Sequence, residues 1–199
     1  MFETIYKWAN RVALGAAWAG GAMMIFASVM VTVDVLIRKI FNVTLGGADE
    51  ISGYLFAIAT SWALPYCLLH RANVRIDALY VHLPQVMRSV LDILGTTLLA
   101  IFAIVLTWRG LALLQDSIAI GALSVTPLHV PLPLPQSFWI AGWVLFSLCL
   151  VLVIAGMVMA LIRGDLLGVH RLGGALSVEE EMDEEGITAH REHQKRNQG

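Results

Sequence analysis

The stretch SFWIAGWVLFSLCLVLVIAGMVMALI, residues 137–162, contains 26 consecutive uncharged residues. A helix of about 20 apolar residues, rising about 1.5 Å per residue, crosses the hydrocarbon layer of a membrane. Backbone amides in lipid must be paired within the segment, so a run of this length predicts a helix. The whole chain agrees, because 58% of its residues are hydrophobic and only 14% are charged, whereas about a quarter are charged in a soluble domain.

Three further apolar runs have the same character, at residues 12–37, 51–69 and 89–108. With the run at 137–162, they predict an all-α, polytopic membrane protein with four transmembrane helices in a domain over residues 12–164. Residues 165–199 differ, because they carry a block of acidic side chains followed by a polar end. That composition predicts a disordered cytoplasmic tail. The acidic block consists of Glu179, Glu180, Glu181, Asp183, Glu184 and Glu185.

Two segments outside the spans have an apolar stripe at helical spacing, which is typical of helices lying along the membrane surface. The first covers residues 1–11 and is expected to form a separate N-terminal interfacial helix. The second follows the run at 51–69 and ends at Pro84. The first stripe consists of Phe2, Ile5, Tyr6 and Ala9 and continues to Val12. The second consists of Ala72, Ile76, Leu79, Tyr80 and Leu83. The sequence therefore predicts interfacial amphipathic helices that contact membrane lipid.

The distribution of Lys and Arg predicts the orientation in the membrane, because cytoplasmic loops carry an excess of both. With both termini inside, the cytoplasmic side receives Lys7, Arg11, Arg71, Arg75, Arg88, Arg163 and Arg171. The outer side then receives only Arg38, Lys39 and Arg109. We therefore expect the N- and C-termini to be cytoplasmic.

The sequence argues against catalysis. The middle of every span lacks Asp, Glu, Lys, Arg and His, the groups that a pump or a membrane enzyme needs at depth. Two acids near span ends have a basic residue four positions away, in Asp34 with Arg38 and in Asp92 with Arg88. The sequence has no metal-ligand spacing or phosphate-binding loop, and no basic stripe for nucleic acid. We expect no enzymatic activity, no cofactor, no metal and no nucleic-acid partner.

The segment before the last span is rich in proline. Residues 125–135 read VTPLHVPLPLP, and the spacing of these prolines favours an extended polyproline conformation over a helix. An apolar extended segment is expected to pack on the spans, on the membrane surface or on another protein.

Several of these segments resemble one known family. GADEISGYLF at residues 47–56 opens the second span, and HRANVRID at residues 70–77 follows it. Together with Pro84 and the Thr126–Pro127 start of the proline-rich segment, they are similar to the small permease subunit of TRAP transporters, the tripartite ATP-independent periplasmic carriers. The resemblance covers about residues 5–165. The positions that match the family motifs are Glu50, Ser52, Tyr54, Arg71, Arg75 and Asp77.

The resemblance implies a non-catalytic subunit in a bacterial inner membrane. Such a subunit braces a large permease subunit, which carries out sodium-driven symport of an organic acid delivered by a periplasmic substrate-binding protein. It also implies that the six motif residues contribute to a subunit or lipid interface. Two alternatives are a self-sufficient four-helix exporter acting as a homodimer, with Asp34 or Asp92 as its nearest intramembrane acid, and a membrane anchor for a redox enzyme. Which acid is carried lies outside this sequence. The sequence also does not choose between the large subunit and the binding protein as the partner of residues 125–135.

Overall fold

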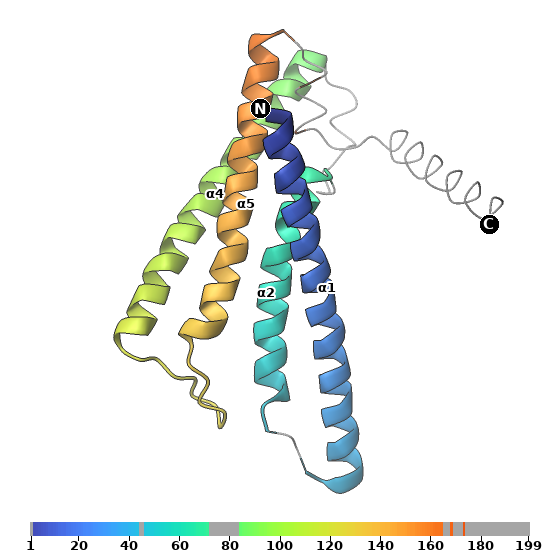
Figure 1. Cartoon of the computed structure of the whole chain (residues 1–199), viewed down its shortest axis with the longest axis vertical. Coiled ribbons are helices and arrows are strands. Elements are labelled where there is room, and N and C mark those ends of the chain that lie inside the picture. The colour runs from blue at the N-terminus through green and yellow to red at the C-terminus, as the bar shows by residue number, and fades with distance from the viewer. Residues whose placement is uncertain (1, 44–45, 72–83, 165–167, 169–172, 174–199) are drawn as a thin grey trace, which may run out of the picture.

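The structure, a computed structural model, describes residues 2–43, 46–71, 84–164, 168 and 173. It contains four long helices, α1 (Phe2–Phe41), α2 (Ala48–Leu69), α4 (Gln85–Ala119) and α5 (Pro133–Ile162) (Figure 1). Each of the four is long and apolar enough to cross a membrane. The predicted class, an all-α protein with four membrane-spanning helices, is confirmed.

The helices pack in a row rather than around a common axis. α1 lies along α2, α2 along α5, and α5 along α4, while α1 and α5 also touch. In Figure 1 α4 and α5 lean apart toward the end at which α2 and α5 begin, which we call the loop end. The order in the row, α1, α2, α5, α4, differs from the order in the sequence.

The N-terminal segment does not form an element of its own. α1 runs without a break from Phe2 through the first apolar run to Phe41. Residues 2–14 contain neither glycine nor proline, so nothing in this stretch interrupts the hydrogen-bond ladder of the helix. The boundary expected after residue 11 is therefore not a break between two helices but a change from polar to apolar sequence within α1. That the N-terminal residues lie along the membrane surface stays a prediction.

Three small residues and one aspartate form the buried face of α1, which packs along α2. Ala13, Gly20, Ala27 and Asp34 are buried on α1 and recur every seven residues, the spacing that keeps one helix face against a partner. At Gly20 the backbones are so close that a Cβ atom would lie 3.0 Å from the carbonyl oxygen of Ala59 on α2. Asp34 is also paired with Arg38, at 3.2 Å between the carboxylate and guanidinium atoms, as the sequence predicts.

A second close approach joins α2 to α5. A Cβ atom on Gly142 would lie 2.4 Å from the Oγ of Ser61 and 2.8 Å from its carbonyl carbon, so only glycine fits at this crossing. Nearer the loop end, the indole N–H of Trp62 donates to the carbonyl oxygen of Phe138 at 2.9 Å. Because α2 and α5 lie between the outer helices of the row, these contacts join the α1–α2 pair to the α4–α5 pair.

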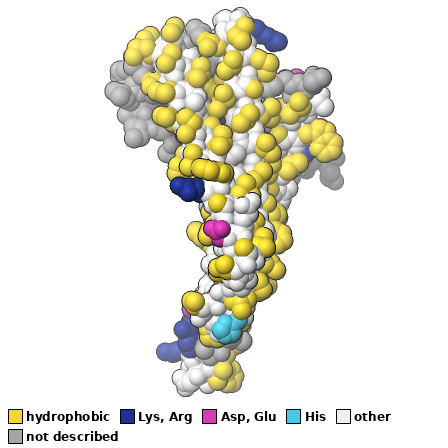
Figure 2. Space-filling view, turned by 90° about the vertical axis from the view of Figure 1, so that its left-hand side faces the viewer, with side chains coloured by type: hydrophobic (Ala, Val, Ile, Leu, Met, Phe, Trp, Pro, Cys, Tyr) yellow, Lys and Arg dark blue, Asp and Glu magenta, His cyan; other side chains and the backbone are white. Residues whose placement is uncertain are grey.

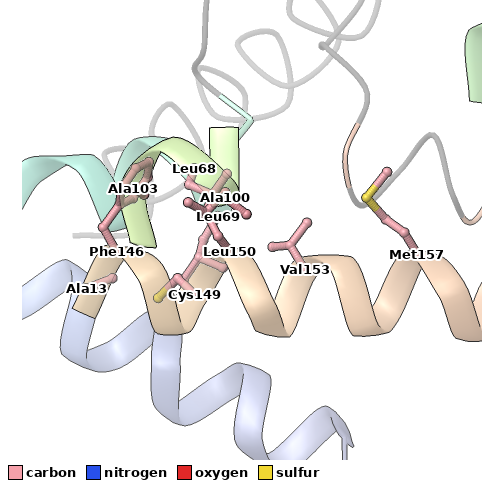
Figure 3. Packing of buried hydrophobic residues seen from close by; sticks show 10 residues of the cluster. All are labelled: Ala13, Leu68, Leu69, Ala100, Ala103, Phe146, Cys149, Leu150, Val153 and Met157. Atoms are coloured by element: carbon pink, nitrogen blue, oxygen red, sulfur yellow. The ribbon is translucent and has the colours of Figure 1, made fainter. Parts of the chain in front are cut away.

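The apolar core lies where α5 meets the other three helices (Figure 3). Ten buried residues form it: Ala13, Leu68, Leu69, Ala100, Ala103, Phe146, Cys149, Leu150, Val153 and Met157. Five of them belong to α5, the most hydrophobic of the four helices. Toward the loop end, the hydroxyls of Thr107 on α4 and Ser147 on α5 are hydrogen-bonded at 3.1 Å.

The start of α5 corrects an expectation. The extended conformation predicted for residues 125–135 is wrong. The chain turns between Thr126 and His129, where the His129 N–H donates to the Thr126 carbonyl at 3.1 Å, and Pro133 and Pro135 lie in the first turn of the helix. The first four N–H groups of a helix have no partner within it, so prolines there cost no hydrogen bond. α4 also differs, because it continues past the predicted end at Trp108 to Ala119.

Apolar side chains cover much of the outer surface. Figure 2 shows one face on which hydrophobic groups predominate and charged groups are scattered. Trp18 on α1 is 75% exposed and Ile25 is 69% exposed. The hydroxyls of Thr32 and Thr60 donate to carbonyls one turn back in their own helices, so these exposed polar groups are satisfied without water. The second predicted interfacial helix, at residues 72–83, and nearly all of the acidic tail lie outside the described residues.

Candidate functional site

The six residues singled out from the sequence do not form one site. Glu50, Ser52 and Tyr54 lie in the first two turns of α2, whereas Arg71 follows its other end. A helix of 22 residues is about 33 Å long at about 1.5 Å per residue, so the two groups are separated by roughly the thickness of a membrane. Arg75 and Asp77 lie outside the described residues.

At the loop end, Glu50 uses both carboxylate oxygens. The hydroxyl of Tyr54, one turn further along α2, donates to Oε1 at 2.7 Å. The hydroxyl of Thr126 donates to Oε2. Ser52 takes no part, since its hydroxyl donates to the carbonyl of Asp49 on the same helix at 2.9 Å. The predicted group of three thus contains two residues that act together and one that caps its own turn.

Thr126 belongs to the segment between α4 and α5, residues 120–132, which we call the α4–α5 loop. Backbone hydrogen bonds close this loop into a narrow hairpin, from Ser124 N–H to the Val130 carbonyl at 2.9 Å and from Leu132 N–H to the Ala122 carbonyl at 3.0 Å. The Oγ of Ser124 accepts the N–H of Val130 at 3.0 Å and lies 2.9 Å from the hydroxyl of Thr126. The hairpin therefore presents Thr126 in a fixed position near its tip.

An apolar contact lies beside this polar one. A Cβ atom on Gly47, just before α2, would fall 2.3 Å from a methyl carbon of Leu128 in the α4–α5 loop. The missing side chain of Gly47 thus makes room for Leu128. Two contacts, Leu128 on Gly47 and Thr126 on Glu50, bring the α4–α5 loop onto the start of α2.

The other end of α2 is tied to α1. The hydroxyl of Tyr6 donates to the carbonyl of Leu69 at 3.1 Å, and the rings of Tyr66 and His70 are 4.0 Å apart. Arg71 then has a left-handed backbone, with φ of 56°, and its N–H bonds to the Leu68 carbonyl at 3.2 Å. This conformation ends the helix, so Arg71 marks the point at which the chain leaves α2.

Sequence reasoning missed the part played by Thr126 and Ser124. The Thr126–Pro127 pair contributes to the family resemblance, but nothing in its spacing indicates that a threonine would meet a glutamate 76 positions earlier. The one available signal is composition. The α4–α5 loop lacks Lys and Arg but contains hydroxyl groups, which can donate hydrogen bonds to the acidic residues at the start of α2.

The hydrogen bonds of this site attach the α4–α5 loop to the start of α2. The carboxylate of Glu50 accepts hydrogen bonds from two hydroxyl groups, and such charge-assisted hydrogen bonds are stronger than those between neutral groups. Among the residues that the structure describes, no group of three His, Cys, Asp or Glu side chains is arranged to hold a metal ion. The predictions of no enzymatic activity and no cofactor rest on the sequence and stay predictions.

Four apolar helices in a row, with close glycine contacts and internally bonded polar groups, define a multi-pass membrane protein of the helical type. Residues 27–164 match the family described as tripartite ATP-independent periplasmic transporters, DctQ component. That match covers more than half of the chain, and the chain belongs to this family of transporter components. No curated protein and no solved structure matches this chain.

Proposed function

We propose that this chain is the small subunit that braces the large permease subunit of a TRAP-type transporter. The large subunit carries out sodium-driven uptake of an organic acid that a periplasmic binding protein delivers. The complex lies in a bacterial inner membrane, with both termini of this chain in the cytoplasm. The observation that carries the proposal is the family match over residues 27–164.

The arrangement of the helices supports a bracing role. A row has two broad sides, and large apolar side chains are exposed on every helix, including Phe26 on α1, Phe56 on α2, Phe102 on α4 and Leu148 on α5. Apolar surface of this extent suits both lipid and the helices of a larger membrane protein. A row one helix thick can widen a partner's scaffold without enclosing a path of its own.

The first experiment is purification of the tagged full-length chain from its native membranes in mild detergent, followed by identification of co-purifying proteins. We expect a much larger polytopic protein in about equal amount. Recovery of this chain alone as a stable homodimer would favour the self-sufficient exporter. Uptake is then measured with the large subunit and the binding protein, with and without this chain, and full sodium-driven uptake in its absence would contradict an obligatory role.

Arg71 and Arg75 provide a sharper test of the interface. If both contact the large subunit, replacing both with Gln should lower recovery of the complex by about tenfold, since unpairing an interfacial charge costs several kcal/mol. Membrane insertion of the chain should be unchanged. Arg11→Gln with Arg163→Gln is the matched control, because both arginines lie on the same predicted side of the membrane and are exposed. Equal recovery from both double variants would leave Arg71 and Arg75 as lipid or topology anchors.

A further inference from the structure

The α4–α5 loop is held to the start of α2 by the hydrogen bond of Thr126 to Glu50 and by the contact of Leu128 with Gly47. Residues 117–136 contain no Asp, Glu, Lys or Arg, and His129 is their one titratable side chain. Glu50 is therefore the carboxylate of the contact, and His129 faces it electrostatically. Several apolar side chains of the loop are largely exposed. Val125 is fully exposed, Leu123 is 54% exposed, and Leu128, which meets Gly47, is still 40% exposed.

The hydrogen-bond network runs from α2 through the side chains into the backbone of the loop. Glu50 accepts from Thr126, Thr126 contacts Ser124 at 2.9 Å, and Ser124 accepts the backbone N–H of Val130 at 3.0 Å. Tyr54 donates to the other carboxylate oxygen and thereby fixes the side chain of Glu50. The carboxylate thus acts on the fold of the loop as well as on its position.

The position of the α4–α5 loop matters because the four helices pack in a row, with α4 at one end and α2 two places away. α4 packs on α5 and not directly along α2, and α4 and α5 lean apart toward the loop end (Figure 1). A close contact of α4 with α5 lies at Gly110, beside Ile140, and the helix continues from there to Ala119. The α4–α5 loop therefore links the end of α4 to the start of α2, through Thr126 on Glu50 and Leu128 on Gly47.

We propose that the hydrogen bond from Thr126 to Glu50, which we call the latch, holds the α4–α5 loop against the start of α2. It thereby sets the spacing of α4 from the α1–α2 pair at the loop end. Glu50 and Thr126 are positioning residues in this role. The α2–α5 contact at Gly142 and Ser61 is independent of the latch, so release of the loop leaves the row assembled. The assignment concerns contacts within this chain and holds whatever partner the chain has.

The test compares hydrogen exchange in the full-length chain in lipid nanodiscs. Thr126→Val removes the donor with little change of shape, and Glu50→Ala removes the acceptor. Each should speed exchange of the amides of Ser124 and Val130 by about tenfold, the effect of losing a hydrogen bond to a charged group. Thr60→Val is the matched control, because its hydroxyl bonds only to Phe56 within α2, and it should leave these amides unchanged.

Spin labels measure the spacing itself. Cysteines at positions 36 on α1 and 113 on α4, where Leu36 and Leu113 are both about half exposed, are labelled in a chain without Cys67 and Cys149. The distance distribution should be narrow in the parent chain and clearly broader with Thr126→Val. Unchanged exchange and an unchanged distribution in both latch variants would overturn the proposal. If Glu50→Ala does not fold, Thr126→Val still decides.

Discussion

Replacing Gly142 with leucine is expected to force α2 and α5 apart and to abolish most of the folded state. A Cβ atom there would lie 2.8 Å from the backbone carbonyl carbon of Ser61, and a backbone atom cannot rotate out of the way as a side chain can. Overpacking of this kind costs about 1–3 kcal/mol where the surroundings can adjust, and more where they cannot. We expect a much lower Tm in detergent and rapid thiol labelling of Cys149, which is buried in the parent chain.

The matched control is Gly95→Leu on α4. Gly95 is also a helical glycine, but a Cβ atom there would meet nothing within 4 Å. In a Cys67→Ser background, Cys149 of this variant should label as slowly as in the parent. Equal labelling of Cys149 in both variants would show that the α2–α5 crossing does not depend on the missing side chain of Gly142.

The second large effect is expected at Gly20, which is adjacent to its own control. A Cβ atom on Gly20 would lie 3.0 Å from the carbonyl oxygen of Ala59, whereas one on Gly21 would meet nothing within 4 Å. Gly20→Leu should therefore loosen α1 from α2 and lower the Tm, while Gly21→Leu should leave the Tm nearly unchanged. A similar drop in both variants would point to the loss of glycine flexibility rather than to the contact with Ala59.

The hydropathy of the sequence was sufficient to predict four helices, because the cost of an unpaired amide in lipid leaves few other structures for runs as long as residues 137–162. It did not predict their bounds. Arg109 ends the uncharged run after Trp108, yet α4 continues to Ala119, since a single arginine at a span end can extend toward water without breaking the helix. Pro133 likewise looked like a helix breaker and instead lies in the first turn of α5.

The order of the helices in the row was not predictable from composition. Glycines at positions 20, 21, 95 and 142 look alike in the sequence, but only Gly20 and Gly142 lie against another backbone. The same limit applies to the candidate site. Glu50 was identified as an acid at a helix start, and its pairing with Thr126 depends on a hairpin whose closure is a tertiary property.

The position of α5 has a consequence for how the chain is made. α5 is the last of the four helices in the sequence, yet it lies between α2 and α4. During synthesis the N-terminal parts emerge first, so α1 and α2 can pair at once, whereas α4 enters the membrane before the helix that it packs against exists. Until α5 follows, the α4 residues of the apolar core, Ala100 and Ala103, lack the cover that α5 provides. Arrival of the most hydrophobic segment of the chain, residues 137–162, is therefore the step that brings the α1–α2 pair and α4 into one structure.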